Sequence, residues 1–452
     1  MGSSDNLYFW FLWSVTLSIC TWTFIEAIRR PQRLLEWPFM ACAMWSYFYV
    51  YMAFDAKRYL GDYLPSTIPV LGQFVPLLCL VGIIMGWRSG LHSSLSKQGT
   101  SPHYPIGILW FTGVAITAVG AYPMYVIVNT TATGGIYDFE NSTAYWYLFF
   151  YVGYPGLALA VWAISQRKVV YYSWLWLITI SVLLVFIYPQ IKNARRGPTF
   201  PAVLIFLVMP SLAKRSIPKR VVFIGGLLCV GLAMLYFVSA RFWTYNEGTW
   251  KEAFQSLTLR SVVSERNKVE TDNEYLNNCH LIWALYRNGK YQYGTGHLEL
   301  LVHWIPHQFW RSKPTLGEGW YSHGELFDDV EAATGIRLLG GGAAAGGVAD
   351  SFLQYGFLAP LFWYGLSWLM ARVYLRARYG NDLRWQCSYI AFMCATHWLV
   401  SQGFAAAFVP WMCFLAVPLL VSLILRKNPP RARANMPKQP IGLKPEPEIT
   451  VK

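Results

Sequence analysis

Charged residues are scarce in this chain of 452 residues, because Asp, Glu, Lys and Arg together make up only 13% of it, whereas hydrophobic residues make up 55%. A soluble protein of this size carries about 25% charged residues. Several runs of about 18 to 25 residues contain no charge at all, and each is long enough to cross a bilayer. The sequence therefore predicts an all-α, multi-pass integral membrane protein.

Several catalytic and metal-binding signatures are also missing. The chain contains no CxxC pair, no Walker A loop, no GxSxG elbow and no HExxH helix, which removes support for zinc, nucleotide-driven and serine-hydrolase chemistry. Cys279 is the one cysteine in a long polar segment, so no disulfide can form within that segment. The N-terminus has neither a basic region nor a cleavage site, and we interpret Leu7 onward as the first span.

Acidic residues are fewer than basic ones, with 23 Asp and Glu against 37 Lys and Arg, which gives a net charge of +14. The basic residues stand mostly in short loops between apolar runs. Such a distribution is typical of membrane orientation signals and not of nucleic-acid binding. We therefore expect no nucleic-acid partner.

The apolar runs predict about eleven spans in four regions. Residues 1–240 would hold eight spans, 241–347 an external loop with interfacial helices, 348–425 three more spans, and 426–452 a basic, disordered tail. The expected spans are 7–27, 37–54, 66–87, 106–128, 144–164, 171–189, 199–212, 221–240, 348–371, 386–403 and 407–425.

Lys and Arg residues favour one set of short loops, and that set is expected to be cytoplasmic. The N-terminus is then outside and the C-terminus is inside. Two segments on the predicted outer face, 188–200 and 241–347, are basic against this trend. We interpret their cations as functional groups.

The first external segment contains Arg195 and Arg196 before a Gly-Pro turn. Two guanidinium groups suit a diphosphate, because each offers a planar fork of donors. The alternative is that the pair only anchors the chain to lipid headgroups.

The second external segment includes WIPHQFWRSKP at 304–314. Its Trp residues predict a short helix in the membrane interface, which would hold Arg311 and Lys313 at the level of the phosphates. Plain snorkelling of both cations is the alternative. The stretch at 256–278 is expected to be mostly helical and to face solvent.

His307, His323 and Asp350 are the candidate acid–base groups. Asp350 stands where the loop enters a span, a place where a carboxylate is functional or else caps the helix. His303 and His307 share a helix face, but no third ligand at useful spacing accompanies them, so no metal site is predicted.

Four motifs stand in order along the second half of the chain: ARRG at 194–197, YQYG at 291–294, IPHQFWRSKP at 305–314 and ADSFLQYG at 349–356. In this order and approximate spacing the chain resembles the bacterial O-antigen polymerases of the Wzy type over roughly residues 190–370. The first half resembles that family only as generic spans. His307 replaces an Arg of the family pattern, and Asp350 replaces a Glu.

The resemblance implies a glycosyltransferase of the bacterial cytoplasmic membrane with a GT-C-like arrangement. A polyprenyl-diphosphate-linked glycan would be the donor, and a sugar hydroxyl on a second lipid-linked repeat would be the acceptor. Neither cofactor nor metal is implied, and the partners would include membrane lipids and a chain-length regulator protein. For the diphosphate we select Arg195, Arg196, Arg311 and Lys313, with Arg260, Arg266 and Arg287 as further candidates.

Two other functions fit the same sequence. An O-antigen-ligase-like transferase would share the donor chemistry and differ only in its acceptor. A transporter for lipid-linked glycans would be expected to carry ionisable groups inside its spans. Here such groups gather in the external segments, which favours transfer over transport.

Overall fold

The computed structural model describes residues 2–60, 67–92, 104–129, 142–166, 173–192, 196–214, 216, 225–226, 274–303, 346–380 and 382–425. Every element within them is helical. The elements are α1 (Gly2–Arg29), η1 (Pro31–Leu35), α2 (Trp37–Trp45), η2 (Ser46–Tyr51), α3 (Met52–Leu60), α4 (Thr67–His92), α5 (Ile106–Asn129), α6 (Ser142–Gln166), α7 (Trp174–Lys192), α8 (Arg196–Ala213), α12 (Glu274–Asn288), α13 (Thr295–His303), α16 (Gly347–Tyr355), η3 (Gly356–Leu358), α17 (Ala359–Tyr379), α18 (Leu383–Ser401) and α19 (Phe404–Leu425).

Among the described residues, which are all helical in their regular structure, four stretches are long and apolar enough to cross a membrane, as expected of an integral membrane protein. They are Asn6–Arg29, Thr67–His92, Ile106–Pro123 and Phe404–Leu425. The count of eleven spans stays a prediction, and the expected span 221–240 lies almost wholly outside the described residues.

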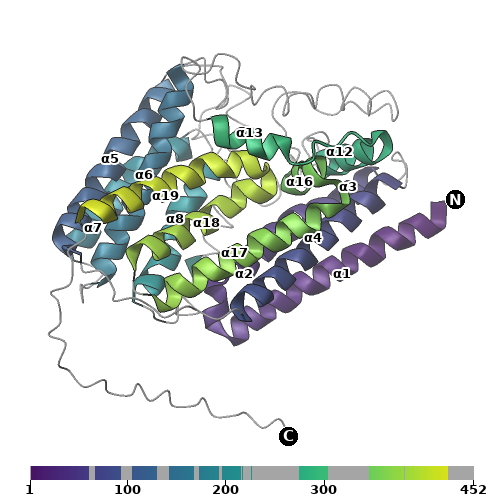
Figure 1. The fold of residues 1–452 in the computed structure, drawn as a ribbon, viewed down its shortest axis with the longest axis horizontal. Helices are drawn as coiled ribbons and strands as arrows, with labels where there is room; N and C mark the ends of the chain where they lie inside the picture. Colours follow the sequence, from purple (N-terminus) through teal and green to yellow (C-terminus); the bar gives the residue numbers. More distant parts are fainter. Residues whose placement is uncertain are drawn as a thin grey trace, which may run out of the picture.

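The long helices α4 and α17 lie side by side and run in the same direction (Figure 1). Their contact depends on three glycines of α4 spaced four residues apart, Gly82, Gly86 and Gly90. A Cβ atom at Gly86 would stand only 2.1 Å from the carbonyl oxygen of Tyr364. Small residues let two helix backbones approach this closely, which is how helices associate where water does not drive them together.

Helices α8 and α18 lie in the same helix bundle as α4 and α17, and they run antiparallel to each other. The ring of Phe200 near the start of α8 lies 5.7 Å from that of His397 near the end of α18. At the opposite ends of these two helices, the Gln386 side chain of α18 donates to the Leu212 carbonyl of α8. The end at which α17 begins, α18 finishes and α16 lies is called the α16 end below.

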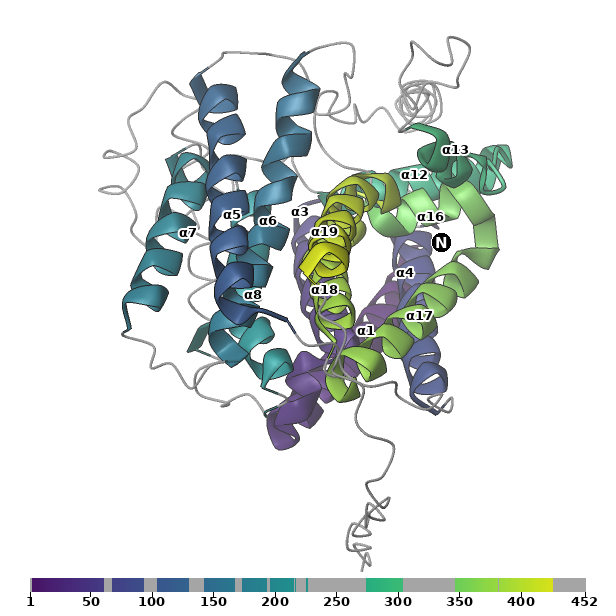
Figure 2. The same cartoon turned by 60° about the vertical axis from the view of Figure 1, so that its left-hand side comes forward.

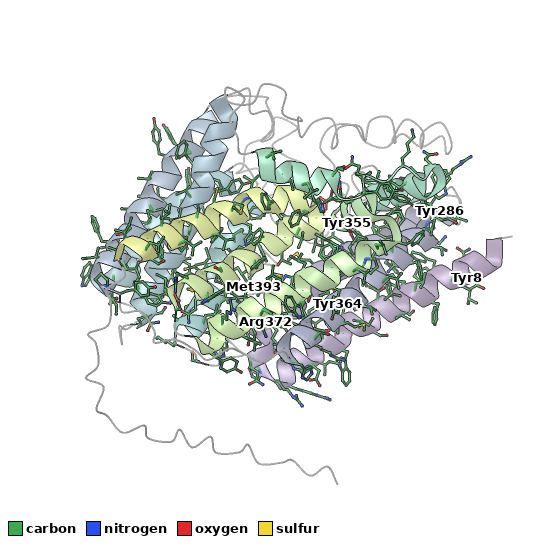
Figure 3. The ribbon with its side chains drawn as sticks, in the orientation of Figure 1. Tyr8, Tyr286, Tyr355, Tyr364, Arg372 and Met393 are labelled. Atoms are coloured by element: carbon green, nitrogen blue, oxygen red, sulfur yellow. The ribbon has the colours of Figure 1, made fainter. Side chains whose placement is uncertain are left out.

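Figure 3 shows Tyr355 at the α16 end and Arg372 farther along α17 toward the opposite end. Arg376 and Arg378 stand in the last turn of α17. Arg88 and His92 lie near the end of α4, so the ends of α4 and α17 on this side both carry basic residues.

A second group of helices, α5, α6 and α7, packs beside this bundle (Figure 2). Glycines again permit the closest approach, because a Cβ at Gly120 would stand 2.6 Å from the Cα of Gly153. The rings of Phe150 and Phe186 stack 4.9 Å apart and join α6 to α7. The group attaches to the bundle mainly through contacts of α6 with α8 and α19.

Two expectations from the sequence are wrong in detail. The span expected at 348–371 is broken at Gly356, whose φ is +55°, so the short helix α16 precedes the longer helix α17. The span expected at 37–54 is helical throughout, as α2, the π-helix η2 and the start of α3. The described end of the stretch 256–278 does not face solvent, because Tyr275 and Asn278 of α12 are buried.

Replacing Gly86 by Ala should destabilise the protein, because the new methyl group must displace the α17 backbone. We expect a cost of about 1–3 kcal/mol, as for other overpacked sites. Gly365 of α17 is the matched control, since a Cβ there meets nothing within 4 Å. Thermal unfolding of both variants in detergent tests this, and equal melting temperatures would contradict the close contact.

Candidate active site

The YQYG motif (291–294) and the ADSFLQYG motif (349–356) contact each other at the α16 end. The Gln292 amide donates to the Leu353 carbonyl at 2.9 Å, and the Gly294 amide donates to the Gln354 carbonyl at 3.0 Å. The Gln354 side chain in turn accepts a hydrogen bond from the Gly296 amide at 3.1 Å. The YQYG turn is thereby fixed against the C-terminal half of α16.

The turn itself has an unusual backbone. Tyr293 has a φ of +51° and Gly294 a φ of +85°, so two consecutive residues are left-handed. A non-glycine residue rarely adopts this conformation, and such residues often occur at functional sites. After the turn, α13 begins at Thr295 and carries His297 back toward α16.

Asp350 lies at the centre of the site, with 3% of its side chain exposed. The Phe404 amide donates to its Oδ2 atom at 2.8 Å, so the carboxylate caps α19 and not its own helix. Asp350 is therefore not the N-cap of α16, a position that Gly346 occupies. The positive end of the α19 dipole stabilises the anion.

The break between α18 and α19 is shaped for this contact. Gly403 has a φ of +126°, and a Cβ atom there would stand 2.8 Å from Oδ2 of Asp350. Only a residue without a side chain brings the start of α19 so near to the carboxylate.

His297 links Asp350 to a tyrosine. Its Nε2 atom is 3.4 Å from Oδ2 of Asp350, and its Nδ1 atom is 3.0 Å from the Tyr355 hydroxyl. With the Tyr355 hydroxyl as the donor to Nδ1, the imidazole proton stands on Nε2 and is directed at the carboxylate.

The second oxygen of Asp350 has no such partner. Oδ1 is buried and accepts no hydrogen bond from the described residues. An unpaired buried carboxylate oxygen is costly to a fold, and each such group calls for an explanation. A carboxylate oxygen of this kind can accept a proton, which is the chemistry that a general base requires.

The described residues hold only some of the predicted site residues. Asp350 is within the site. Arg287 is exposed in the last turn of α12, with its guanidinium 5.3 Å from the Trp283 ring. The backbone of Arg196 begins α8, and its side chain is not described. Outside the described residues lie Arg195, Arg260, Arg266, His307, Arg311, Lys313 and His323.

The start of α8 nevertheless belongs to the same end of the molecule as Asp350. Phe200 contacts His397 of α18. Two residues farther along α18, the Leu399 carbonyl oxygen is so near to Gly347 that a Cβ there would stand 1.8 Å away. Gly347 opens α16, and Asp350 follows three residues later.

His297 is the site residue that sequence reasoning missed. The sequence analysis selects His303, His307 and His323, since these stand in or near the aromatic part of the loop. The position of His297 could have indicated its role, because it follows the YQYG motif by three residues and ADSFLQYG contains both of its partners. A single histidine in a sequence gives no indication of a partner 53 residues away.

A second buried histidine has different properties. His280 of α12 is 1% exposed, and neither ring nitrogen has a hydrogen-bond partner among the described residues. Burial lowers its pKa to about 4, so it stays neutral at physiological pH. His280 contributes to packing, whereas His297 is held by two polar partners.

The described residues of this site do not include a set of metal ligands. Within the described part of the chain, no group of three or more His, Cys, Asp and Glu side chains is arranged to hold a metal ion. The described polar groups of the site are suited to moving a proton.

Comparison with known proteins gives no relative: no protein-family model, no curated protein and no solved structure matches the chain.

Replacing Asp350 by Asn should leave the melting temperature equal to that of the wild type or raise it. The amide oxygen still accepts from Phe404, and the cost of a buried charge with one unpaired oxygen disappears. Replacing Asp350 by Ala should cost about 1 kcal/mol, since Phe404 loses its cap.

Asp382→Asn is the matched control for the same chemical change. Asp382 caps α18 and pairs with Arg384 at 2.6 Å, so its charge supports the fold. This variant should be less stable than the wild type in the same thermal scan. An Asp350→Asn variant as unstable as Asp350→Ala would show that the Asp350 charge is structural.

Proposed function

We propose that the protein is a glycan polymerase that joins lipid-linked oligosaccharides at the outer face of a bacterial cytoplasmic membrane. A polyprenyl-diphosphate-linked chain is the donor, and a hydroxyl group of a second lipid-linked repeat unit is the acceptor. The observation that carries the proposal is the buried carboxylate of Asp350, paired with His297 and retaining one unpaired oxygen.

Such a transfer requires a base that removes the proton of the acceptor hydroxyl group. In this mechanism the acceptor oxygen forms a bond with the anomeric carbon while the bond from that carbon to the diphosphate oxygen breaks. The bonding electrons leave with the diphosphate, and the hydroxyl proton passes to Oδ1 of Asp350. His297 keeps Asp350 oriented through Oδ2.

The departing diphosphate requires positive charge. Arg195 and Arg196 are proposed for this role, because α8 begins at Arg196 on the end of the bundle that carries Asp350. Arg311 and Lys313 of the external segment are proposed to complete the cation cluster. Prepositioned cations stabilise charge that develops on a leaving group.

The same proposal implies an orientation of the protein in the membrane. The α16 end and the N-terminus face outward, and the basic termini of α4 and α17 face the cytoplasm. The GT-C-like arrangement, the eleven spans and the chain-length regulator protein as a partner are part of this proposal.

A polymerisation assay tests the function directly. Purified protein incubated with a polyprenyl-diphosphate oligosaccharide, without nucleotide sugars, should produce a ladder of products on a gel. Asp350→Asn should reduce the rate by about 10²–10⁴-fold, because that is the usual contribution of a general base. Arg196→Ala and Arg311→Ala should also reduce it strongly while the proteins stay folded.

Other outcomes of this assay replace the proposal. Glycan that appears on a different acceptor indicates a ligase-type transferase, and glycan that crosses a liposome membrane unchanged indicates a transporter. A ladder that persists in Asp350→Asn excludes Asp350 as the base but keeps the polymerase.

Variants of His297 and Tyr355 separate positioning from packing. His297→Ala should lower kcat with little change in KM, because Asp350 loses the partner that orients it. Tyr355→Phe removes one hydrogen bond and should have the smaller effect. His297→Gln, whose amide can still donate to Oδ2, should recover part of the rate. Equal rates in all three variants would contradict the positioning role.

A further inference from the structure

A cavity of about 650 Å³ lies between α1, the start of α2 and α4, away from the α16 end. These helices pack against one another in the part of the bundle where α4 and α1 finish (Figure 1). Most of its wall is apolar. The apolar wall residues are Ile19, Trp22, Pro38, Phe39, Val81, Ile84, Met85, Trp87 and Leu91.

The wall offers no hydroxyl proton to a ligand. The Ser18 hydroxyl donates to the Ser14 carbonyl at 2.7 Å, and the Thr23 hydroxyl donates to the Ile19 carbonyl at 2.9 Å. Both hydrogen bonds stay within α1. The interior of the cavity therefore suits a hydrocarbon chain.

The charged lining residues are confined to the helix ends and carry both signs. Glu26 pairs with Arg33 at 3.0 Å. Glu36 accepts a hydrogen bond from the Trp87 indole at 3.2 Å. Arg88 is exposed and forms no ion pair with the described residues. A headgroup that meets this rim would encounter carboxylates and a guanidinium together.

The helices that form the cavity indicate what surrounds it. Both α1 and α4 contain stretches long and apolar enough to cross a membrane, and the cavity lies between them. Its apolar wall and charged rim follow the order of a lipid leaflet, with hydrocarbon inside and headgroups at the edge. A cavity of this volume falls within the range of small-ligand sites.

We propose that this cavity binds an aminophospholipid such as phosphatidylethanolamine. One acyl chain occupies the apolar interior, the phosphate contacts Arg88, and the ammonium group contacts Glu36. Both charges of the zwitterionic headgroup thereby find partners of opposite sign. The site is separate from Asp350, and the inference does not depend on the polymerase proposal.

A cationic partner would oppose the effect that burial has on Glu36. Burial raises the pKa of this carboxyl group, although Arg33 and the Trp87 hydrogen bond oppose the change. An ammonium group at the rim would favour the charged form and offset the cost of burial.

Native mass spectrometry of the detergent-solubilised full chain tests the site. We expect the wild type to retain one phosphatidylethanolamine in preference to phosphatidylglycerol. Arg88→Ala should reduce retention of both lipids, by about fivefold, since one cation near lipid phosphate contributes about 1 kcal/mol. Glu36→Gln should abolish the preference while phosphatidylglycerol is still retained.

Two further variants keep the test decisive. Ile84→Trp fills the cavity and should remove the retained lipid, whereas Arg372→Ala changes another arginine on the neighbouring helix α17 and should not. Thermal scans confirm that each variant is folded. Equal retention in Ile84→Trp and the wild type would overturn the cavity as the site. A preference for phosphatidylglycerol in the wild type would overturn the ammonium contact.

Discussion

A carboxylate taken out of water must find donors inside the protein, and this constraint organises the α16 end. Asp350 receives one backbone amide from α19 and faces one imidazole from α13. Neither group belongs to its own helix, so three segments must meet for the charge to be tolerated. The remaining oxygen has no partner among the described residues and is a cost to the fold, which the proposed role of Asp350 as a base would explain.

The arrangement separates two kinds of environment along one bundle. At the α16 end, the break between α18 and α19 leaves the Phe404 amide free to donate to the carboxylate. At the opposite end, arginines stand beside aromatic rings, with Arg376 4.3 Å from Trp385. The glycine residues of α4 bring its backbone against that of α17. Such close packing leaves the two helices little freedom to slide along each other, so the two ends of the bundle keep a fixed separation.

Most helices were predictable from the sequence, since long apolar runs must satisfy their backbone polar groups internally. Asp350 could be selected because a carboxylate beside an apolar run is uncommon. The break at Gly356 could not, because glycine also occurs within the helices α4 and α6. The burial of α12 was hidden by its polar composition, since Asn278 and His280 face other helices and not water. His297 depends on tertiary contacts that leave no local pattern.

The parallel contact of α4 with α17 also constrains the order of assembly. Ser367 donates to the Ile83 carbonyl across 284 residues of sequence, so α4 is synthesised long before its partner. Until α17 is synthesised, the glycine face of α4 lacks the helix that it packs against in the folded protein. The α16 end, which connects directly to α17, is therefore completed late in biogenesis, and incomplete chains carry the early helices without a formed site.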